Sequence, residues 1–229
     1  MMIKSIVLLS GGLDSLVSLA LTIKNSSQIL ALTFNYGQKS YSAELNASKN
    51  IANYYGINHK IVDLPWLAEI STSSLNTCDN VPLLDVKNLD DLSITQNTSK
   101  SVWVPNRNGL FVNIAASFAE AFCYDNVVIG ANKEEAQTFK DNSVEFLNAI
   151  NNSYKNSMNQ NVELSAPLIN LSKDEIIKVG IENSVPFELL HSCYVSNDVH
   201  CGMCESCLRL KRALVNNNRE DIAKQIFRK

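Results

Sequence analysis

The amino-acid sequence predicts an α/β fold in which helices flank a parallel sheet. Short apolar runs that suit buried strands alternate with segments of helical spacing. The first of these runs, residues 3–9, ends directly at a pair of glycines. Strands that alternate with helices normally form a parallel sheet, which binds ligands at the carboxyl ends of its strands.

The first half of the chain is expected to contain five regular elements and then an irregular segment. The five elements are a strand over 3–9, a helix over 14–24, a strand over 29–34, a helix over 43–55 and a strand over 59–64. Between residues 66 and 102 the periodicity fails, and Ser, Thr, Asn and Asp dominate. Because long structureless loops are uncommon in compact domains, this segment is expected to be a surface excursion with short local elements, such as a lid.

Regular spacing returns in the second half of the chain. The expected elements are a helix over 108–124, a strand over 127–129, a helix over 144–155, a helix over 172–182 and a C-terminal helical stretch. Ser172 and Glu175 have the spacing of a capping box at the start of the fourth of these elements. Without internal repeats, the chain is expected to be a single domain, 1–229, in which 190–229 form a small C-terminal subdomain.

The composition is that of an ordinary globular protein, with 45% hydrophobic and 19% charged residues among 229. A net charge of −3 argues against general electrostatic binding of nucleic acid. No apolar run approaches the roughly 20 residues that a membrane span needs. A cytoplasmic protein without a membrane or direct nucleic-acid partner is expected.

The segment Ser10-Gly11-Gly12-Leu13-Asp14-Ser15 lies between a predicted strand and a predicted helix, where phosphates are usually held. The glycines allow backbone N–H groups to approach an anion, and the helix adds its positive N-terminal end. Asp14 is unusual beside an anion, so it is expected to orient the loop or to hold Mg²⁺. The loop lacks the lysine of a Walker A motif. The alternative is a simple turn.

Four cysteines lie within fifteen residues and include two overlapping C-x-x-C steps: Cys193, Cys201, Cys204 and Cys207. Four thiolates match a closed tetrahedral Zn²⁺ site, which leaves no position for water and is therefore structural. An iron–sulfur cluster and a redox pair are the alternatives. Cys123 is interpreted as a core residue, and Cys78 has no assigned role.

The glycine loop resembles the PP-loop of the ATP pyrophosphatases, which cleave ATP between the α and β phosphates. Four further segments resemble the 7-cyano-7-deazaguanine synthase (QueC) family: 34–38 (FNYGQ), 104–108 (VPNRN), 167–176 (PLINLSKDEI) and 192–207. The resemblance runs over nearly the whole chain. It implies a Rossmann-like PP-loop domain of the adenine nucleotide alpha hydrolase type, with a small zinc-binding C-terminal segment.

The resemblance also implies the activity. Members of the family are ATP-dependent carbon–nitrogen ligases that convert 7-carboxy-7-deazaguanine and ammonia to the nitrile, through adenylated intermediates, in queuosine biosynthesis. The implied cofactors are ATP, Mg²⁺ and structural Zn²⁺, and the implied assembly is a homodimer that uses free ammonia. The alternatives are a PP-loop enzyme that adenylates another acceptor, such as tRNA or a protein terminus, and a nucleotide-binding module without activity.

The site residues follow from the matched motifs. Lys173, Arg107 and Asp14 are the expected catalytic residues, and substrate binding is expected at Gln38, Arg107, Asn108 and Asp141. The expected ATP-binding residues are Leu9, Ser10, Gly11, Gly12, Leu13, Asp14, Ser15, Leu16, Val17, Ser18 and Leu19. The alternatives are a solvated first-turn lysine at 173, a helix N-cap at Asn108 and a turn residue at Gln38.

The chain departs from the family pattern in two places. Family members often read Asp-Tyr-Gly-Gln-Arg-His where this chain has residues 35–40 (NYGQKS), and they often carry a Tyr-Pro-Asp-Cys-Arg stretch. Residues 130–143 stand in its place, with Asp141 matching the motif aspartate but no arginine after it. Glu134 and Glu135 are the alternative residues for hydrogen bonding to the base. The other interpretation of both is that they are solvated.

Overall fold

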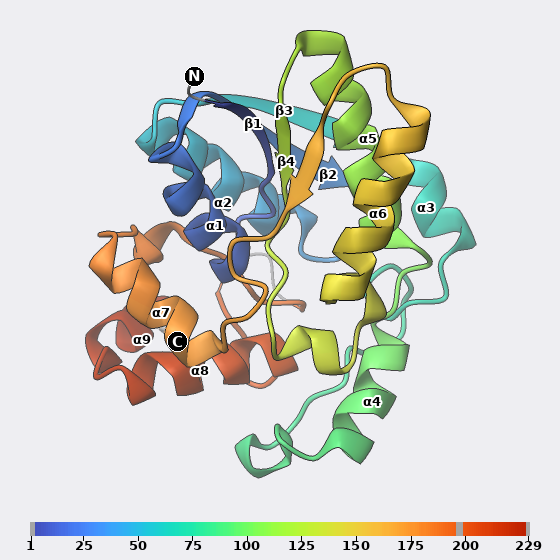
Figure 1. Ribbon diagram of the computed structural model, residues 1–229. Coiled ribbons are helices and arrows are strands. Elements are labelled where there is room, and N and C mark those ends of the chain that lie inside the picture. The colour runs from blue at the N-terminus through green and yellow to red at the C-terminus, as the bar shows by residue number, and fades with distance from the viewer. Residues whose placement is uncertain (1–2, 196–198, 228–229) are drawn as a thin grey trace.

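A computed structural model describes residues 3–195 and 199–227, and within these ranges five parallel strands form one sheet (Figure 1). The strands are β1 (Ile3–Leu8), β2 (Ser26–Asn35), β3 (Asn58–Asp63), β4 (Asn126–Val128) and β5 (Glu163–Ser165). Their order is β3-β2-β1-β4-β5. The chain first builds the sheet outward from β1 to β3 and then continues on the other side of β1. The reversal between β1 and β4 is the place where open α/β sheets bind ligands.

Helices cover both faces of this sheet. The described helices are α1 (Leu13–Ile23), α2 (Tyr41–Tyr54), α3 (Pro65–Ile70), α4 (Leu92–Ser101), α5 (Arg107–Phe122), α6 (Val144–Ser157), α7 (Lys173–Glu182), α8 (Glu205–Asn216) and α9 (Glu220–Ile226). The short 3₁₀ turns are η1 (Val86–Asn88), η2 (Glu135–Gln137), η3 (Lys140–Asn142) and η4 (Phe187–Leu189). Figure 1 shows α5 and α6 on one side of the sheet, with α1 and α2 on the other and α7 to α9 below them.

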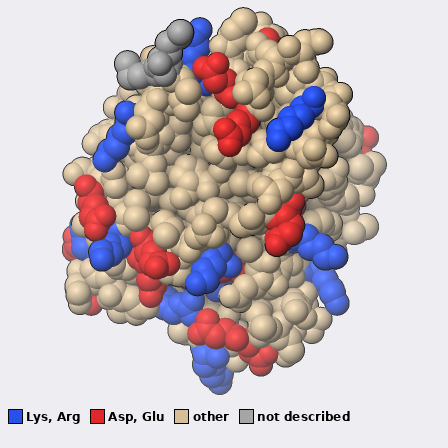
Figure 2. All heavy atoms as spheres, viewed as in Figure 1, with Lys and Arg blue, Asp and Glu red and all other residues tan. Residues whose placement is uncertain are grey.

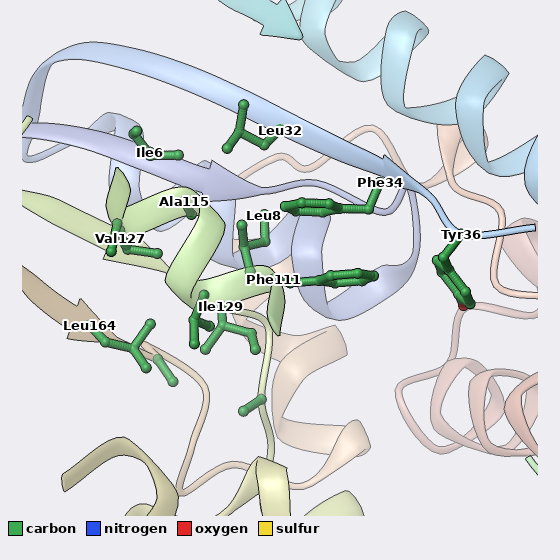
Figure 3. Close-up of a cluster of buried hydrophobic side chains, with 14 of the residues drawn as sticks. Ile6, Leu8, Leu32, Phe34, Tyr36, Phe111, Ala115, Val127, Ile129 and Leu164 are labelled. Carbon is green, nitrogen blue, oxygen red and sulfur yellow. The ribbon is translucent and has the colours of Figure 1, made fainter. Parts of the chain in front are cut away.

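The alternation of side chains along β1 supplies two hydrophobic cores, because successive residues of a strand point to opposite faces. Ile6 and Leu8 belong to the core under α5 and α6, whereas Val7 and Leu9 belong to the core under α1, α7 and α8. Figure 3 shows the first core, in which residues of β1, β2, β4 and β5 meet α5. Near the carboxyl ends of the strands, the rings of Phe34 and Phe111 stack with 4.1 Å between their centroids.

The expected order of strands and helices is confirmed, with one strand added and two residue interpretations corrected. The added strand, β5, was not predicted, because only one of its three residues is apolar. The irregular segment 66–102 contains most of α3, η1 and α4, which agrees with the expected short local elements. Cys123 is exposed at the left-handed C-cap of α5, so its interpretation as a core residue is wrong. The N-cap of α5 is Asn106 with φ 48°, so the N-cap alternative for Asn108 is also wrong.

The segment 66–102 is attached to the C-terminal part of the chain. The backbone N–H of Leu84 donates to the carbonyl of Met203 at 3.0 Å, and Leu83 forms a β-bridge with Cys204. Arg212 of α8 pairs with Asp90 at 2.8 Å. Two segments more than 100 residues apart in sequence therefore form one wall below the sheet.

The surface carries both signs of charge. Figure 2 shows acidic and basic residues interspersed over the face in view, without a broad region of one sign among the described residues there. Among the described helices, none has the length and apolar character needed to cross a membrane.

Gly130 permits the close approach of the end of β4 to the start of α1. A Cβ at this position would lie 2.9 Å from the carbonyl carbon of Asp14 and 2.9 Å from the nitrogen of Ser15, which are both backbone atoms. Gly130→Ala is therefore expected to lower the free energy of unfolding by about 1–3 kcal/mol and to weaken nucleotide binding. Chemical denaturation and nucleotide titration measure the two effects.

Gly56→Ala is the control, because a Cβ there meets nothing within 4 Å although φ is +62°. Backbone strain of about 1–2 kcal/mol should lower its stability without a change in nucleotide affinity. Equal nucleotide affinity in Gly130→Ala and the parent protein would contradict the assigned packing role.

Candidate active site

A cavity of about 220 Å³ opens at the carboxyl ends of the strands. Its wall comes from the turns after β1, β2 and β4, from the first turns of α1, α5 and α7, and from the segment that leads into the cysteine cluster. Parallel strands present these turns at the same edge of the sheet. The cavity therefore gathers residues from nearly every part of the chain.

The glycine loop forms one side of the cavity through Leu9, Ser10, Gly12, Leu13, Asp14 and Ser15. Gly12 is the N-cap of α1 with φ −80° and ψ 170° and supplies no side-chain cap. The Oγ atoms of Ser10 and Ser15 lie 3.2 Å apart. A helix start whose N-cap residue has no side chain, flanked by two hydroxyl groups, fits an anionic group such as phosphate.

The remaining residues of the predicted ATP-binding segment do not line the cavity. Leu16, Val17, Ser18 and Leu19 are fully buried, and the three apolar ones belong to the core that anchors α1. Gly11 has φ +84°, and its carbonyl accepts the backbone N–H of His191 at 2.8 Å. These residues hold the loop in place from behind.

Lys173 lies between two carboxylates inside the cavity wall. Its Nζ is 2.5 Å from Asp14 Oδ2 and 2.8 Å from Glu135 Oε1, and its side chain is 9% exposed. The alternative of a solvated first-turn lysine is therefore wrong. The backbone N–H of Lys173 also donates to Glu134 Oε1 at 2.7 Å. The sequence left open whether Glu134 and Glu135 are solvated. Both accept a hydrogen bond from Lys173.

The protonation states in this cluster depend on both burial and pairing. Burial raises the pKa of Asp14 to about 6, although Lys173 opposes the shift. Burial alone would lower the pKa of Lys173, but the carboxylates of Asp14 and Glu135 raise it above its ordinary value. Asp14 Oδ1 is buried without a hydrogen-bond partner among the described residues. A cation such as Mg²⁺ fits this oxygen on the cavity wall.

Arg107 begins α5, one residue before the predicted start of this helix, and lines the cavity. Its Nη1 donates to the hydroxyl of Tyr36 at 3.1 Å, and its guanidinium lies 5.6 Å from the centroid of that ring. Although burial would lower the pKa of Arg107, Tyr36 and Asp141 raise it. The guanidinium is therefore a fixed positive charge that faces the cavity.

The other predicted substrate-binding residues lie near Arg107 but differ in exposure to the cavity. Asn108 lines it and donates its Nδ2 to the carbonyl of Asp141 at 3.4 Å. Asp141 is not among the lining residues, whereas its neighbour Asn142 is. Gln38 lines the cavity, but its amide is engaged within the protein. It accepts from the Tyr36 backbone N–H at 3.0 Å and donates to Phe34 O and Glu44 Oε2.

The four cysteine sulfurs form a single cluster in which all Sγ atoms lie within 4.8 Å of one another. Cys201 Sγ and Cys207 Sγ are 3.9 Å apart. Four sulfurs at about 2.3 Å around one tetrahedral ion stand about 3.8 Å apart, so the cluster fits one metal ion. Backbone N–H groups support the sulfurs: Cys201 N donates to Cys193 Sγ at 3.4 Å, and Cys204 N donates to Cys201 Sγ at 3.3 Å.

The segment before Cys193 joins this cluster to the glycine loop. The backbone N–H of Leu13 donates to Ser192 Oγ at 3.2 Å, next to the bond between His191 and Gly11. The backbone N–H of Ser192 in turn donates to His200 Nε2 at 2.9 Å. The cysteine cluster and the glycine loop are therefore connected by a short chain of hydrogen bonds.

Sequence reasoning missed the supporting role of Ser192 and the pairing of Glu134 and Glu135 with Lys173. Ser192 stood inside a matched motif, but its hydroxyl carried no signal for an interaction 179 residues away. The two glutamates follow the end of β4, and polar residues at the carboxyl end of a strand were an available signal.

A parallel sheet with a Ser-Gly-Gly loop after β1, and with Lys173 and Arg107 lining the cavity beyond it, is the pattern expected of the PP-loop class of nucleotide-binding proteins. The family model described as "Queuosine biosynthesis protein QueC" matches residues 4–218. The chain therefore belongs to the QueC family.

Curated relatives agree with this assignment. A 7-cyano-7-deazaguanine synthase of Methanobrevibacter smithii is 49% identical over 210 residues, which cover 92% of each chain. The synthase of Carboxydothermus hydrogenoformans is 46% identical and covers 93% of this chain and 99% of its own. The synthase of Bdellovibrio bacteriovorus is 48% identical and covers 94% of both.

Proposed function

We propose that this chain is an ATP-dependent ligase that converts 7-carboxy-7-deazaguanine and ammonia to 7-cyano-7-deazaguanine. Membership of the QueC family and the names of the relatives support the substrate. The observation that carries the chemistry is the cavity that places the glycine loop, Lys173 and Arg107 around one space. The glycine loop and Lys173 suit a nucleoside triphosphate, and Arg107 suits a carboxylate.

In this proposal the loop from Ser10 to Ser15 holds the β and γ phosphates. Mg²⁺, with the unpartnered Oδ1 of Asp14 as one ligand, neutralises phosphate charge when bound. Lys173 stabilises the negative charge that develops as the bond between the α and β phosphates breaks. Glu135 and Glu134 keep its ammonium and backbone in place.

Two rounds of adenylation account for the reaction. A carboxylate oxygen attacks the α phosphorus, and pyrophosphate leaves. The lone pair of ammonia then forms a C–N bond while the C–O bond to AMP breaks with its electron pair on AMP, and one proton of the nitrogen passes to water. In the second round the amide oxygen attacks another ATP, after which AMP leaves and the two remaining nitrogen protons pass to water to give the nitrile. Positioning by Arg107 and charge neutralisation supply most of the rate.

The deazaguanine base is proposed to lie near Arg107. Phe34, Tyr36 and Phe111 give this part of the cavity an aromatic wall, against which a flat heterocycle stacks. Asn108 and Asp141, directly or through the adjacent Asn142, are proposed to read its polar edge. Gln38 is retained only as a contact of the cavity wall, because its amide is already bonded within the protein.

Zinc is the ion proposed for the cysteine cluster. The sulfurs of an iron–sulfur cluster bind different iron atoms and so stand farther apart than ligands of a single ion. The close spacing therefore favours one tetrahedral Zn²⁺ with four thiolates and a structural role. The homodimer, the cytoplasmic location and the division at residue 190 stay predictions.

The proposed function is tested by incubation with Mg·ATP, ammonium and 7-carboxy-7-deazaguanine. AMP, pyrophosphate and the nitrile are the expected products, identified by chromatography and mass spectrometry. Formation of ADP, or AMP without the nitrile, would contradict the proposal. Exchange of labelled pyrophosphate into ATP with a tRNA or peptide acceptor, and not with the deazaguanine acid, would favour the alternative acceptor.

The Asp14 carboxylate gives a pH-dependent prediction. Because burial raises its pKa to about 6, the carboxylate is ionised above that pH and protonated below it. Mg·ATP affinity is expected to fall by about tenfold per pH unit below pH 6, since the protonated form cannot hold Mg²⁺ or pair with Lys173. Calorimetric titration between pH 5 and pH 7.5 measures the effect.

The phosphates of ATP titrate in the same range, so Asp14→Asn is the matched control. This variant should bind Mg·ATP weakly at all pH values and show only the shallow dependence that belongs to the nucleotide. The same steep dependence in both proteins would contradict the role of Asp14.

A further inference from the structure

A second cavity of about 20 Å³ lies beside the main one. Glu135, Lys173, Tyr194 and Ser206 line both cavities, so these side chains stand between the two spaces. Much of the rest of its wall comes from four residues of the irregular segment 66–102: Val81, Pro82, Thr98 and Val102. The segment 66–102 thus supplies part of the wall of a small chamber beside the proposed catalytic lysine.

The size of the chamber restricts its occupant. A cavity needs about 10–15 Å³ of this measure to hold one water molecule. The inner space of the chamber, about 20 Å³, therefore has room for one molecule with a single heavy atom. Ammonia has the size of water, and the proposed reaction requires it beside an adenylated carboxylate.

The walls of the chamber offer both acceptors and apolar surface. Glu205 Oε2 accepts the hydroxyl of Thr98 at 3.0 Å, and its Oε1 accepts Nε of Arg209 at 3.0 Å. Glu135 is paired with Lys173. Each carboxylate thus has a cation beside it, and the chamber carries no net charge from these four groups. Carboxylate oxygens in such a wall accept the N–H donors of a small molecule.

We propose that this chamber is the ammonia site of the enzyme and that ammonia passes from it into the main cavity between Glu135 and Tyr194. The proposal rests on the proposed function. It also gives the segment 66–102 a role, because Val81, Thr98 and Val102 exclude bulk water and larger amines from the approach to the acyl adenylate.

Filling the chamber is the first test. Val102→Phe adds volume at its wall, whereas Leu92→Phe adds a similar volume at an exposed position of α4 and serves as the control. Val102→Phe is expected to raise the KM for ammonium by about tenfold or more, because even one methylene in a fitted site changes binding by that factor. Leu92→Phe should stay within about twofold of the parent protein.

Exchange of labelled pyrophosphate into ATP with the deazaguanine acid, without ammonium, isolates the adenylation step. This exchange should be unchanged in Val102→Phe, which also shows that the variant is folded. If Val102→Phe does not fold, Val102→Leu gives a milder version of the same test. An unchanged KM for ammonium, or an equal loss of exchange and of ammonium-dependent turnover, would overturn the ammonia site.

Enlarging the chamber is the second test. The parent protein should discriminate strongly between ammonia and methylamine, and Val102→Ala should form the N-methylamide more readily while its KM for ATP is unchanged. The same selectivity in both proteins would overturn the proposal. Absence of pyrophosphate exchange in the parent protein would instead contradict the proposed function, so the two failures are distinguishable.

Discussion

Lys173→Ala is expected to reduce kcat by about 100- to 1,000-fold, the usual effect of removing one group that stabilises charge in a transition state. Lys173 is the group that links the glycine loop, through Asp14, to the turn after β4, through Glu135. Its loss removes both a positive charge beside the phosphates and the partner of two carboxylates. Single-turnover measurement of AMP formation reports the effect on the adenylation step.

The same substitution is expected to lower the free energy of unfolding. Removal of one member of a buried ion pair typically costs about 3–5 kcal/mol, because the remaining charge is left without compensation. Lys173→Met with Asp14→Asn and Glu135→Gln removes all three charges at similar volume. This triple variant should regain much of the stability and none of the activity. Undiminished turnover in Lys173→Ala would remove the lysine from the site.

Removal of the metal is expected to have the largest effect on stability. Structural zinc contributes about 10–16 kcal/mol of binding free energy in small zinc domains, which is comparable to the roughly 5–15 kcal/mol of a whole folded domain. Cys193, Cys204 and Cys207 are almost fully buried, so an empty site leaves three thiols packed against one another. Chelation or Cys204→Ala should therefore unfold at least the segment around the cluster.

Nucleotide binding should be lost together with the metal. The N–H of Leu13 and the carbonyl of Gly11 are bonded to Ser192 and His191, which lie directly before the first metal ligand. Metal analysis, thermal unfolding and Mg·ATP titration measure the three linked effects. Cys78→Ala, at an exposed cysteine outside the cluster, is the control. A metal-free protein with unchanged melting temperature and ATP affinity would contradict the structural role.

Local motifs are the part of this molecule that the sequence predicts well. The glycine loop follows an apolar run and precedes helical spacing, and the capping box at Ser172 and Glu175 is present as expected. The cysteines are close in sequence, so their spacing alone indicates a common ligand. The start of α5 at Arg107 was predicted to within one residue, because Pro105 limits where a helix can begin.

Contacts between distant segments were not predictable in the same way. The burial of Lys173 depends on Glu135, which lies 38 residues earlier and on a turn that has no periodic pattern. The amide of Gln38 looked free for a ligand, but Glu44 of the following helix occupies it. The chamber beside Lys173 exists because α4 packs near α8, and nothing in the polar segment 66–102 indicates that packing.

The position of β1 in the middle of the sheet has a consequence for synthesis on the ribosome. This strand is made first, yet one of its two edges is paired only by β4, after residue 126. Until then the nascent chain exposes an apolar strand edge, which is a hazard for association with other chains. The residues that bond the loop from behind, His191 and Ser192, emerge later still. Nucleotide binding should therefore arise abruptly, when the metal ligands leave the exit tunnel, and not gradually as the sheet grows.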